Sequence, residues 1–435
     1  MKDFAISENA AVQAQLDRLG ALSLPSGRLG LDTVRELCTR LGNPQERLPP
    51  VFHVAGTNGK GSTCSYLRYI LEAEGLTVHS ATKPHLVRYN ERIRIAGKLI
   101  EDELLGALLK EVLDAGEGLE PSFFEVTTVA TFLAYARHPA DACVIETGLG
   151  GRLDATNVMP RAAVCGIATL GLDHEAFLLA PEEGVPSDPL ARIAFEKASI
   201  AKPGVPLVTM AYPQIAADSV AETAARIGAP LIMRGRDWDA QIAGSILYRD
   251  QHGELPLPLP ALPGTHQAEN AALAVAMIRH QRAVQVTLGA VGKGIVDARW
   301  PARLQRLGAG PLTTLAGGRT VWLDGGHNPD AGLAIARHLE SQPPVHLIMG
   351  MLANKDPSAI LKPLADRALS VSVVPAPGHD AHTPEDFAPF TSLPVGSFAT
   401  VPEAIAALPP EGDVLIAGSL YLAGEVLRLN KEIPD

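Results

Sequence analysis

A nearly apolar run, a glycine-rich loop and a helical stretch follow one another without a break between residues 51 and 74. The run VFHVAG (51–56) has the composition of a strand that is covered on both faces in a parallel sheet. The loop AGTNGKGST (55–63) comes next, and residues 62–74 have the pattern of a helix. A strand, a tight turn and a helix form the first part of a βαβ unit. This order predicts a parallel α/β sheet.

The same alternation of strand-like and helical stretches continues along the chain. Further apolar runs of strand length lie at 142–148, 162–170 and 206–212. Helical stretches at 101–115 and 126–137 alternate with these runs. We therefore expect an α/β fold whose N-terminal domain is a doubly wound parallel sheet.

The pattern then restarts in a second part of the chain. Residues 266–282 and 286–294 have helical patterns, and the sequence DARWPARLQRLG after them breaks the rhythm. More strand-like runs follow at 320–326, 345–351, 369–377 and 413–419. We place a domain boundary at the break, which gives a large domain over 1–297 and a smaller α/β domain over 298–435. The proline-rich acidic segment 178–190 is expected to be a surface loop.

Composition narrows the functions that the chain can serve. Apolar residues make up 46% and charged residues 20%, the balance of a globular protein with a sizeable core. We expect neither a membrane span nor a signal peptide, because no apolar run is long enough and the start, MKDFAISENA, is polar. The net charge of −11 argues against general nucleic-acid binding but leaves room for a local cationic pocket. The four cysteines lie far apart in the sequence, which predicts a cytoplasmic protein without a disulfide scaffold.

The loop at residues 56–62 carries the strongest chemical signal in the chain. Its glycines let the backbone curl so that successive N–H groups point toward phosphate oxygens. Lys60 adds a positive charge, and the helix after the loop adds its positive N-terminal end. The spacing departs from the usual Walker pattern, because Gly61 separates Lys60 from Ser62. An ordinary strand-to-helix turn is the alternative, and we favour nucleotide binding because strand, helix and lysine occur together.

Carboxylates and a histidine follow two more of the predicted strands. Glu146 ends one run, Asp154 follows it after a glycine turn, and the next run leads into Asp173 and His174. Ligands bind at the carboxyl ends of strands in open α/β sheets, and Mg²⁺ prefers carboxylate, phosphate and water oxygens. A histidine alone is more often a hydrogen-bonded loop residue. Beside two such strand ends and a phosphate loop, His174 indicates a metal site.

Two adjacent aromatic residues, Phe123 and Phe124, precede Glu125 at the start of a predicted helix. Adjacent aromatics at such a place are usually part of the core. The alternative is an aromatic wall for a flat heterocycle. The residues by themselves leave both interpretations open.

Together and in this order, the motifs resemble those of the folylpolyglutamate synthase and dihydrofolate synthase family, within the Mur-ligase-like ATP-dependent amide ligases. The motifs are AGTNGKGS, PHLVRYNERIRI (84–95), FFEVTT, IETGLGGRLDATN, LDHE, FEKASIAKPG (195–204), LPGTHQAENA (262–271), WPARLQ (300–305), LDGGHNPDA (323–331) and GSLYLAGEVL (418–427). The resemblance covers nearly the whole chain. It implies a Mur-ligase-like N-terminal domain with a phosphate loop and a Rossmann-like C-terminal α/β domain.

The resemblance implies which residues bind the nucleotide and the metal. Those expected to contact ATP are Gly56, Thr57, Asn58, Gly59, Lys60, Gly61, Ser62, Asn270, Arg303 and Asp324. Glu146 and His174 are expected to hold Mg²⁺. Lys197 matches a lysine that is carbamylated in the family, so its side chain would act as a carboxylate toward a second magnesium ion. A plain ammonium has no acceptor, and without the resemblance Lys197 would be interpreted as a surface lysine on a helix.

The resemblance also implies the substrate side of the site. Residues expected on the pterin side are Ser122, Phe123, Phe124, Glu125, Leu153, Asp154 and Ala155. His327 and Ser419 are similar to residues near ATP and glutamate. The expected catalytic residues are Lys60, Lys197 and His327, with His327 as a candidate to take the proton of the attacking amine.

One position departs from the family pattern. The family usually has T-S-P-H here, and its serine is a ligand of the first magnesium ion, whereas this chain has Thr82-Lys83-Pro84-His85. A protonated lysine cannot coordinate Mg²⁺. One hypothesis is that the Lys83 ammonium neutralises part of the γ-phosphate charge or displaces metal from the first site. The other is that Lys83 turns away and Thr82 or water serves instead.

The chemistry implied by the resemblance is ATP-dependent amide formation. The γ-phosphoryl group passes to a substrate carboxylate to give an acyl phosphate and ADP, and the α-amine of L-glutamate then attacks. Dihydropteroate and reduced folates are the expected substrates, so we expect a bifunctional dihydrofolate synthase and folylpolyglutamate synthase. The alternatives are a Mur-type ligase for a non-folate acid and a repurposed P-loop protein without ligase activity. We expect a cytoplasmic monomer that uses ATP and Mg²⁺, with no nucleic-acid or membrane partner.

Overall fold

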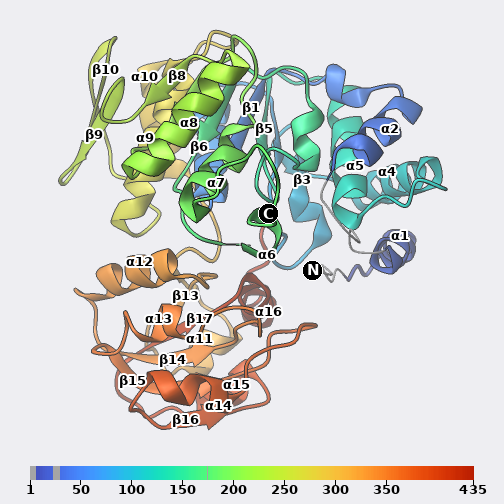
Figure 1. Cartoon of the computed structure of the whole chain (residues 1–435). Helices are drawn as coiled ribbons and strands as arrows, with labels where there is room; N and C mark the ends of the chain where they lie inside the picture. Colours follow the sequence, from blue (N-terminus) through green and yellow to red (C-terminus); the bar gives the residue numbers. More distant parts are fainter. Residues whose placement is uncertain (1–5, 23–29, 174) are drawn as a thin grey trace. The chain divides into compact units, whose positions relative to one another are not determined.

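The computed structural model describes residues 6–22, 30–173 and 175–435, which form two compact units (Figure 1). The first unit contains the described residues up to Lys83, Arg88–Ala261 and Ala268–Ala298. The second contains Pro84–Val87, Leu262–Gln267 and Arg299–Asp435. The main division therefore falls after Ala298, and two short segments of the second unit come earlier in the chain.

The first unit is built on a mostly parallel sheet. In the described part of the chain this sheet has eight strands, in the order β4-β3-β2-β5-β1-β6-β7-β8. Their bounds are β1 Val51–Ala55, β2 Val78–Ala81, β3 Ile93–Ile95, β4 Lys98–Leu99, β5 Ala142–Glu146, β6 Val164–Ile167, β7 Leu207–Thr209 and β8 Leu231–Met233. Among these described strands, β3 pairs antiparallel with both β2 and β4, and the other pairs are parallel. Every residue of β1 and β5 is buried, which explains their almost continuous apolar sequences.

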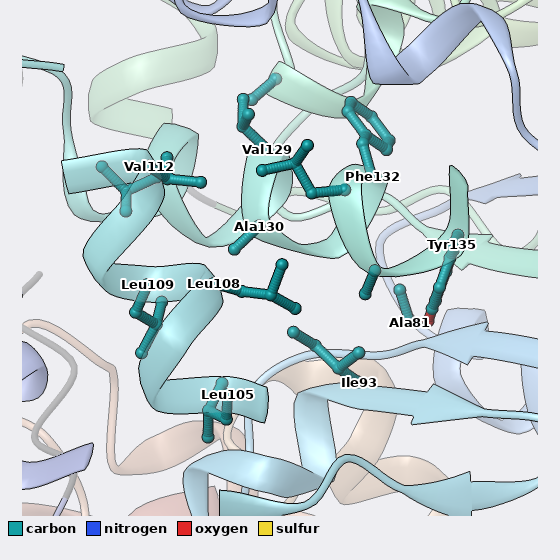
Figure 2. Packing of buried hydrophobic residues seen from close by; sticks show 14 of the residues in the cluster. Ala81, Ile93, Leu105, Leu108, Leu109, Val112, Val129, Ala130, Phe132 and Tyr135 are labelled. Atoms are coloured by element: carbon teal, nitrogen blue, oxygen red, sulfur yellow. The ribbon is translucent and has the colours of Figure 1, made fainter. Parts of the chain in front are cut away.

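Helices alternate with these strands along the chain. Their bounds are α1 Ala10–Ala21, α2 Asp32–Arg40, α3 Lys60–Ala73, α4 Asp102–Ala115, α5 Phe123–Arg137, α6 Glu175–Leu178, α7 Pro189–Ala198, α8 Gln214–Ile227, α9 Thr265–Arg279 and α10 Leu288–Asp297. Buried residues of α4 recur at the spacing of one helix face, at Leu105, Leu108, Leu109 and Val112. They share a hydrophobic cluster with Val129 and Phe132 of α5 and Ile93 of β3 (Figure 2). This cluster fixes α4 and α5 on the sheet.

A second sheet in the first unit was not expected from the sequence. In the part of the chain that the structure describes, it consists of three antiparallel strands in the order β11-β10-β9 (Figure 1). Their bounds are β9 Trp238–Ile242, β10 Ile246–Asp250 and β11 Gly253–Leu257. Buried and more exposed residues alternate along β9 and β10. This period of two is the signal of a half-buried strand.

The second unit is a smaller α/β sandwich around a mostly parallel sheet. Over the described residues this sheet has six strands, in the order β12-β13-β17-β14-β15-β16. Their bounds are β12 Gln305–Arg306, β13 Val321–Leu323, β14 Val345–Met349, β15 Ala368–Val373, β16 Val395–Ser397 and β17 Asp413–Ala417. The helices are α11 Pro311–Leu315, α12 Pro329–Leu339, α13 Ser358–Leu361, α14 Pro384–Phe387, α15 Val401–Ala406 and α16 Leu420–Asn430. Successive residues of β17 alternate between separate hydrophobic clusters on the two faces of the sheet.

The expected α/β fold is confirmed, and the apolar runs become central strands of the two parallel sheets. The predicted surface loop is found over 179–188, and the prediction for 178–190 is wrong only at its two ends. Leu178 ends α6, and Pro189 begins α7, where Asp188 caps the helix by accepting two backbone N–H bonds of 2.9 Å. Among the described residues, no helix combines the length and the apolar character needed to cross a membrane.

We predict that the close packing of α10 on α3 is sensitive to a single methyl group. A Cβ atom at Gly294 would lie 2.5 Å from the Cα of Ile70. Because that neighbour is helix backbone, Gly294→Ala should lower the free energy of unfolding by about 1–3 kcal/mol. Gly289→Ala is the control on the same helix, since no described atom outside its own surroundings lies within 4 Å of its Cβ position. Calorimetric unfolding measures both variants, and equal Tm values would contradict the packing argument.

Candidate functional site

The loop between β1 and α3 depends on glycine at two positions. Gly56 and Gly59 have φ angles of +153° and +83°, which L side chains rarely adopt. A Cβ atom at Gly56 would lie 2.9 Å from the Cβ of Ala168, and one at Gly59 would overlap the Asn270 side chain. The loop therefore curves tightly, and the expected nucleotide contact Asn270 lies beside it.

Lys60 is the first residue of α3, and its ammonium lies against the loop. Its Nζ donates to the carbonyl of Gly56 over 3.0 Å and to the carbonyl of Thr57 over 3.2 Å. The N–H of Thr57 donates to the Thr169 carbonyl, just beyond the end of β6, over 2.7 Å. A positive side chain and the positive end of a helix thus meet at one loop, an arrangement that suits a bound anion.

Lys197 reaches the same loop from α7. Its side chain is buried, and its Nζ donates to the Gly56 carbonyl over 2.9 Å. Burial, helped by the charge of Lys60, lowers the pKa of Lys197 to about 7. An exposed helical lysine, the alternative from sequence, is therefore wrong. Burial thus favours the neutral amine, which is the nucleophilic form.

Glu146, the last residue of β5, is buried and lies beside Lys83. The Lys83 N–H donates to Glu146 Oε2 over 3.0 Å, and Lys83 Nζ donates to the Glu146 carbonyl over 3.2 Å. The same Nζ lies 4.1 Å from the centre of the Phe124 ring. Burial lowers the pKa of Lys83 to about 8, although Asp154 and Glu146 oppose this shift. The Lys83 side chain therefore lies at the end of β5, on the main-chain carbonyl of Glu146, while the Lys83 backbone N–H holds the carboxylate.

Asp154 fixes the glycine turn that follows β5. One carboxylate oxygen accepts the N–H groups of Gly148 and Leu149, each over 2.8 Å. The other accepts the N–H and the hydroxyl of Thr156, over 3.0 and 2.6 Å. Because this hydroxyl donates to Asp154, it accepts from His53 Nε2, which lies 2.8 Å away. Neither His53 nor Thr156 was expected from the sequence, although a histidine inside an apolar strand was a usable signal.

Phe123 and Phe124 are the first two residues of α5. A capping box of Ser122 and Glu125 fixes the N-terminus of this helix. Ser122 Oγ accepts the Glu125 N–H, and Glu125 Oε2 accepts both the N–H and the hydroxyl of Ser122. Phe123 and Phe124 are half-buried and pack against the hydrophobic core. Phe124 fills the space that a Cβ atom of Gly148 would need. Both rings thus pack partly in the core and stay partly exposed, which leaves the two interpretations of the pair open.

Leu153 and Ala155 lie on either side of Asp154, after the glycine turn. Ala155 is buried in the core cluster, and Leu153 packs against it while remaining half-buried. Their positions are therefore set by the core and by the hydrogen bonds of Asp154.

In the second unit, Asp324 is buried just after β13. Its carboxylate accepts the N–H groups of Leu304 over 2.7 Å and of Gly326 over 2.6 Å. Burial raises the pKa of Asp324, opposed mainly by the charge of Arg303. Arg303 also donates to the carbonyl of Ala302 over 2.9 Å. The two expected nucleotide contacts of this unit therefore lie close together.

His327 and Ser419 occupy turns that lead into helices of the second unit. Nδ1 of His327 lies 3.0 Å from the Gly325 carbonyl, a contact that orients the ring. The hydroxyl of Ser419 accepts the Leu422 N–H over 3.1 Å and caps α16. Ser419 is buried, so this cap fixes its side chain.

Only some of the expected metal ligands lie among the residues that the structure describes. His174 lies outside the described residues. Among the residues that the structure does describe, no three His, Cys, Asp or Glu side chains form a group that could hold a metal ion. Glu146 is nevertheless a buried carboxylate at a strand end, and Lys197 is a lysine with a neutral form near pH 7. These two groups suit a divalent cation if Lys197 gains a carboxylate.

Comparison with known proteins points to one family. The chain is 32% identical to dihydrofolate synthetase of Saccharomyces cerevisiae over 432 residues, covering 92% of this chain and 98% of the yeast protein. It superposes on Escherichia coli FolC in complex with DHPP and ADP with a TM-score of 0.83, at 31% identity and over 96% and 97% of the two chains. A bifunctional folylpolyglutamate synthase/dihydrofolate synthase with Mn, AMPPNP and L-glutamate bound gives a TM-score of 0.83, at 28% identity and over 98% and 99%. No family model matches the chain.

The lowered pKa of Lys197 predicts a pH-dependent cost of folding. Unfolding restores the ordinary pKa of 10.5, so between about pH 7 and 10.5 the unfolded chain binds a proton that the folded chain does not. The native chain should therefore lose stability relative to Lys197→Met as the pH falls through this window, and the difference should level off below pH 7. Thermal unfolding in CO₂-free buffer across the window measures the difference. Lys98→Met, at an exposed lysine, is the control and should show no such slope; parallel curves for Lys197→Met and the native chain would refute the shift.

Proposed function

The chain belongs to the dihydrofolate synthase and folylpolyglutamate synthase family, and we propose that it joins L-glutamate to dihydropteroate and to reduced folates, with ATP converted to ADP and phosphate. The observation that carries the proposal is the convergence of Lys60 and Lys197 on the Gly56 carbonyl. Two lysines at a glycine loop and a helix N-terminus favour a polyanion such as a triphosphate. The nucleotides and L-glutamate in the solved relatives support the same reaction.

The reaction must activate a carboxylate, which resists amine attack because its carbon is electron-rich and oxide is a poor leaving group. Transfer of the γ-phosphoryl group gives an acyl phosphate, and phosphate leaves after the α-amine of glutamate attacks. Lys60 and the N-terminal end of α3 stabilise negative charge on the transferring oxygens. We assign to His327 the removal of a proton from the attacking amine, and the contact of its Nδ1 with the Gly325 carbonyl orients the ring.

The site has the residues that Mg²⁺ requires if Lys197 is carbamylated. The neutral amine of Lys197 adds to the carbon of CO₂ and loses one proton, which converts the side chain into a carbamate anion. Glu146 and His174 would hold one Mg²⁺ ion, and this carbamate would be a ligand of a second. When bound, Mg²⁺ supplies positive charge that offsets the phosphate oxygens.

The substrate side of the site is assigned in two ways. We assign the half-buried rings of Phe123 and Phe124, with Leu153 and Ala155, to the pterin ring. Ser122, Glu125 and Asp154 serve it indirectly, because their side chains are already engaged in fixing a helix start and a glycine turn. Further contacts in this assignment are Asn270, Arg303 and Asp324 for the nucleotide, and His327 and Ser419 for glutamate.

We also propose a cytoplasmic monomer. Each of the four cysteines is a buried free thiol, as suits a reducing compartment. Each unit has its own hydrophobic core, which supports folding without a partner chain.

We predict glutamate-dependent ADP release with both pterin acids. Purified protein should turn over Mg-ATP only when L-glutamate and either dihydropteroate or tetrahydrofolate are present, and the products should gain one glutamate in mass. Turnover with one acid alone would assign a single activity. Slow ATP hydrolysis that ignores both acids would instead indicate a repurposed nucleotide-binding protein, and turnover with another acid would indicate a Mur-type ligase.

We also predict that Lys83 changes the metal requirement. Its ammonium lies at the Glu146 carbonyl and the Phe124 ring, so it occupies space and charge beside the expected metal ligand. Lys83→Ser should therefore bind one more divalent ion per nucleotide than the native chain. Calorimetric titration of Mn²⁺ into the complex with AMPPNP counts the ions, with Lys98→Ser as the control. The same stoichiometry in the native chain and Lys83→Ser would rule out displacement of metal by Lys83.

A further inference from the structure

A buried network of alternating charges lies behind the Lys197 side of the site. Among the described residues it joins Arg152, Glu182, Arg192 and Glu196. Arg152 pairs with Glu182 over 2.6 Å and with Glu196 over 3.0 Å. Arg192 pairs with the same two carboxylates over 2.9 and 3.0 Å. The side chains of Arg192 and Glu196 are only 6% and 5% exposed, so little solvent screens these pairs.

The network binds together three segments that carry the expected metal ligands. Arg152 belongs to the glycine turn that follows Glu146, and Glu196 directly precedes Lys197 on α7. Glu182 lies between α6 and α7, on the segment that begins just after position 174. The network thus connects the chain on both sides of the site to the helix that supplies Lys197.

The C-terminal end of α7 packs tightly against the backbone of Gly151 and Arg152. The N–H of Arg152 donates to the Glu196 carbonyl over 2.7 Å. A Cβ atom at Gly151 would lie 2.6 Å from this carbonyl oxygen and 3.1 Å from the Cα of Lys197. The backbone of the glycine turn therefore packs directly on Lys197, and a shift of Arg152 would move both.

The two arginines of the network, together with Arg226, also lie around the ring of Phe195 near the end of α7. The guanidinium groups of Arg152, Arg192 and Arg226 lie 5.3, 5.9 and 5.0 Å from the centre of its ring. A planar guanidinium that pairs with a carboxylate and faces a ring is fixed in direction as well as in position. Removing the carboxylate of Glu182 would leave Arg152 and Arg192 with Glu196 as their shared partner in the network. The two guanidinium groups would then no longer be fixed in place.

We propose that Glu182 is a positioning residue, which holds Lys197 against the phosphate loop through Arg152 and Arg192. The inference rests on the proposed function, because it takes Lys197 as the residue that becomes a metal ligand. Glu182 itself lies on the segment between α6 and α7 and acts through the two arginines. Its side chain is 17% exposed, although sequence alone predicts a surface loop at this place.

The test compares Glu182→Gln with Glu183→Gln in the full chain. Glu183 is the exposed neighbour, so the control changes the same charge on the same segment. Glu182→Gln should weaken Mn²⁺ binding to the AMPPNP complex by about tenfold or more and lower kcat to a similar degree, with the KM for tetrahydrofolate unchanged. Glu183→Gln should match the native chain in all three. Native Mn²⁺ affinity and kcat in a folded Glu182→Gln variant would overturn the proposal.

A second variant covers the case in which Glu182→Gln does not fold. Glu182→Leu combined with Arg192→Leu removes one charge of each sign, so no buried ion is left without a partner. This variant should fold and should still show the loss of Mn²⁺ affinity; a native affinity would again overturn the proposal. A native chain that binds no Mn²⁺ with AMPPNP and shows no glutamate-dependent turnover would instead refute the proposed function.

Discussion

The parallel pairing of β1 with β5 and β6 is the constraint on which the site depends. Val54 lies opposite Glu146 on one side and Gly166 on the other, so the three strands end at the same edge. From this edge β1 delivers the phosphate loop and β5 delivers Glu146. A shift of one residue in the register would turn Glu146 to the other face of the sheet. The positions of the phosphate loop and of Glu146 therefore depend on the backbone pairing of these strands.

This edge concentrates positive charge where water is scarce. The ammonium groups of Lys60 and Lys197 share one carbonyl, and Lys83 lies between a carbonyl and an aromatic ring. Burial lowers the pKa of both Lys83 and Lys197, which means that the folded chain disfavours their charged forms. Such a site destabilises the fold that contains it. The large apolar clusters of the first unit supply the stability that the site lacks.

The sequence alone predicted the parts of the site that are adjacent to one another along the chain. The strand, loop and helix around Lys60, and the carboxylate at the end of β5, lie where they were predicted. The role of Lys197 needed the resemblance, because an isolated lysine on a helix carries no sign that packing will bury it. The Arg152–Glu182 pair was missed for the same reason, since its partners lie 30 residues apart. The sheet of β9, β10 and β11 was missed although its alternating burial follows a recognisable period.

The place of the Lys60 ammonium has a consequence for how strongly the loop holds an anion. In this structure its Nζ already donates to the Gly56 and Thr57 carbonyls. The ammonium has three N–H donors, so a phosphate that accepts more than one of them must replace a bond to a carbonyl, and the enthalpy of capture then includes a difference between two sets of bonds. The Gly56 carbonyl keeps the hydrogen bond from Lys197 after such an exchange, whereas the Thr57 carbonyl must find another donor or water. Affinity is thereby moderated in the resting loop, and a product nucleotide leaves it by restoring bonds that the protein makes with itself.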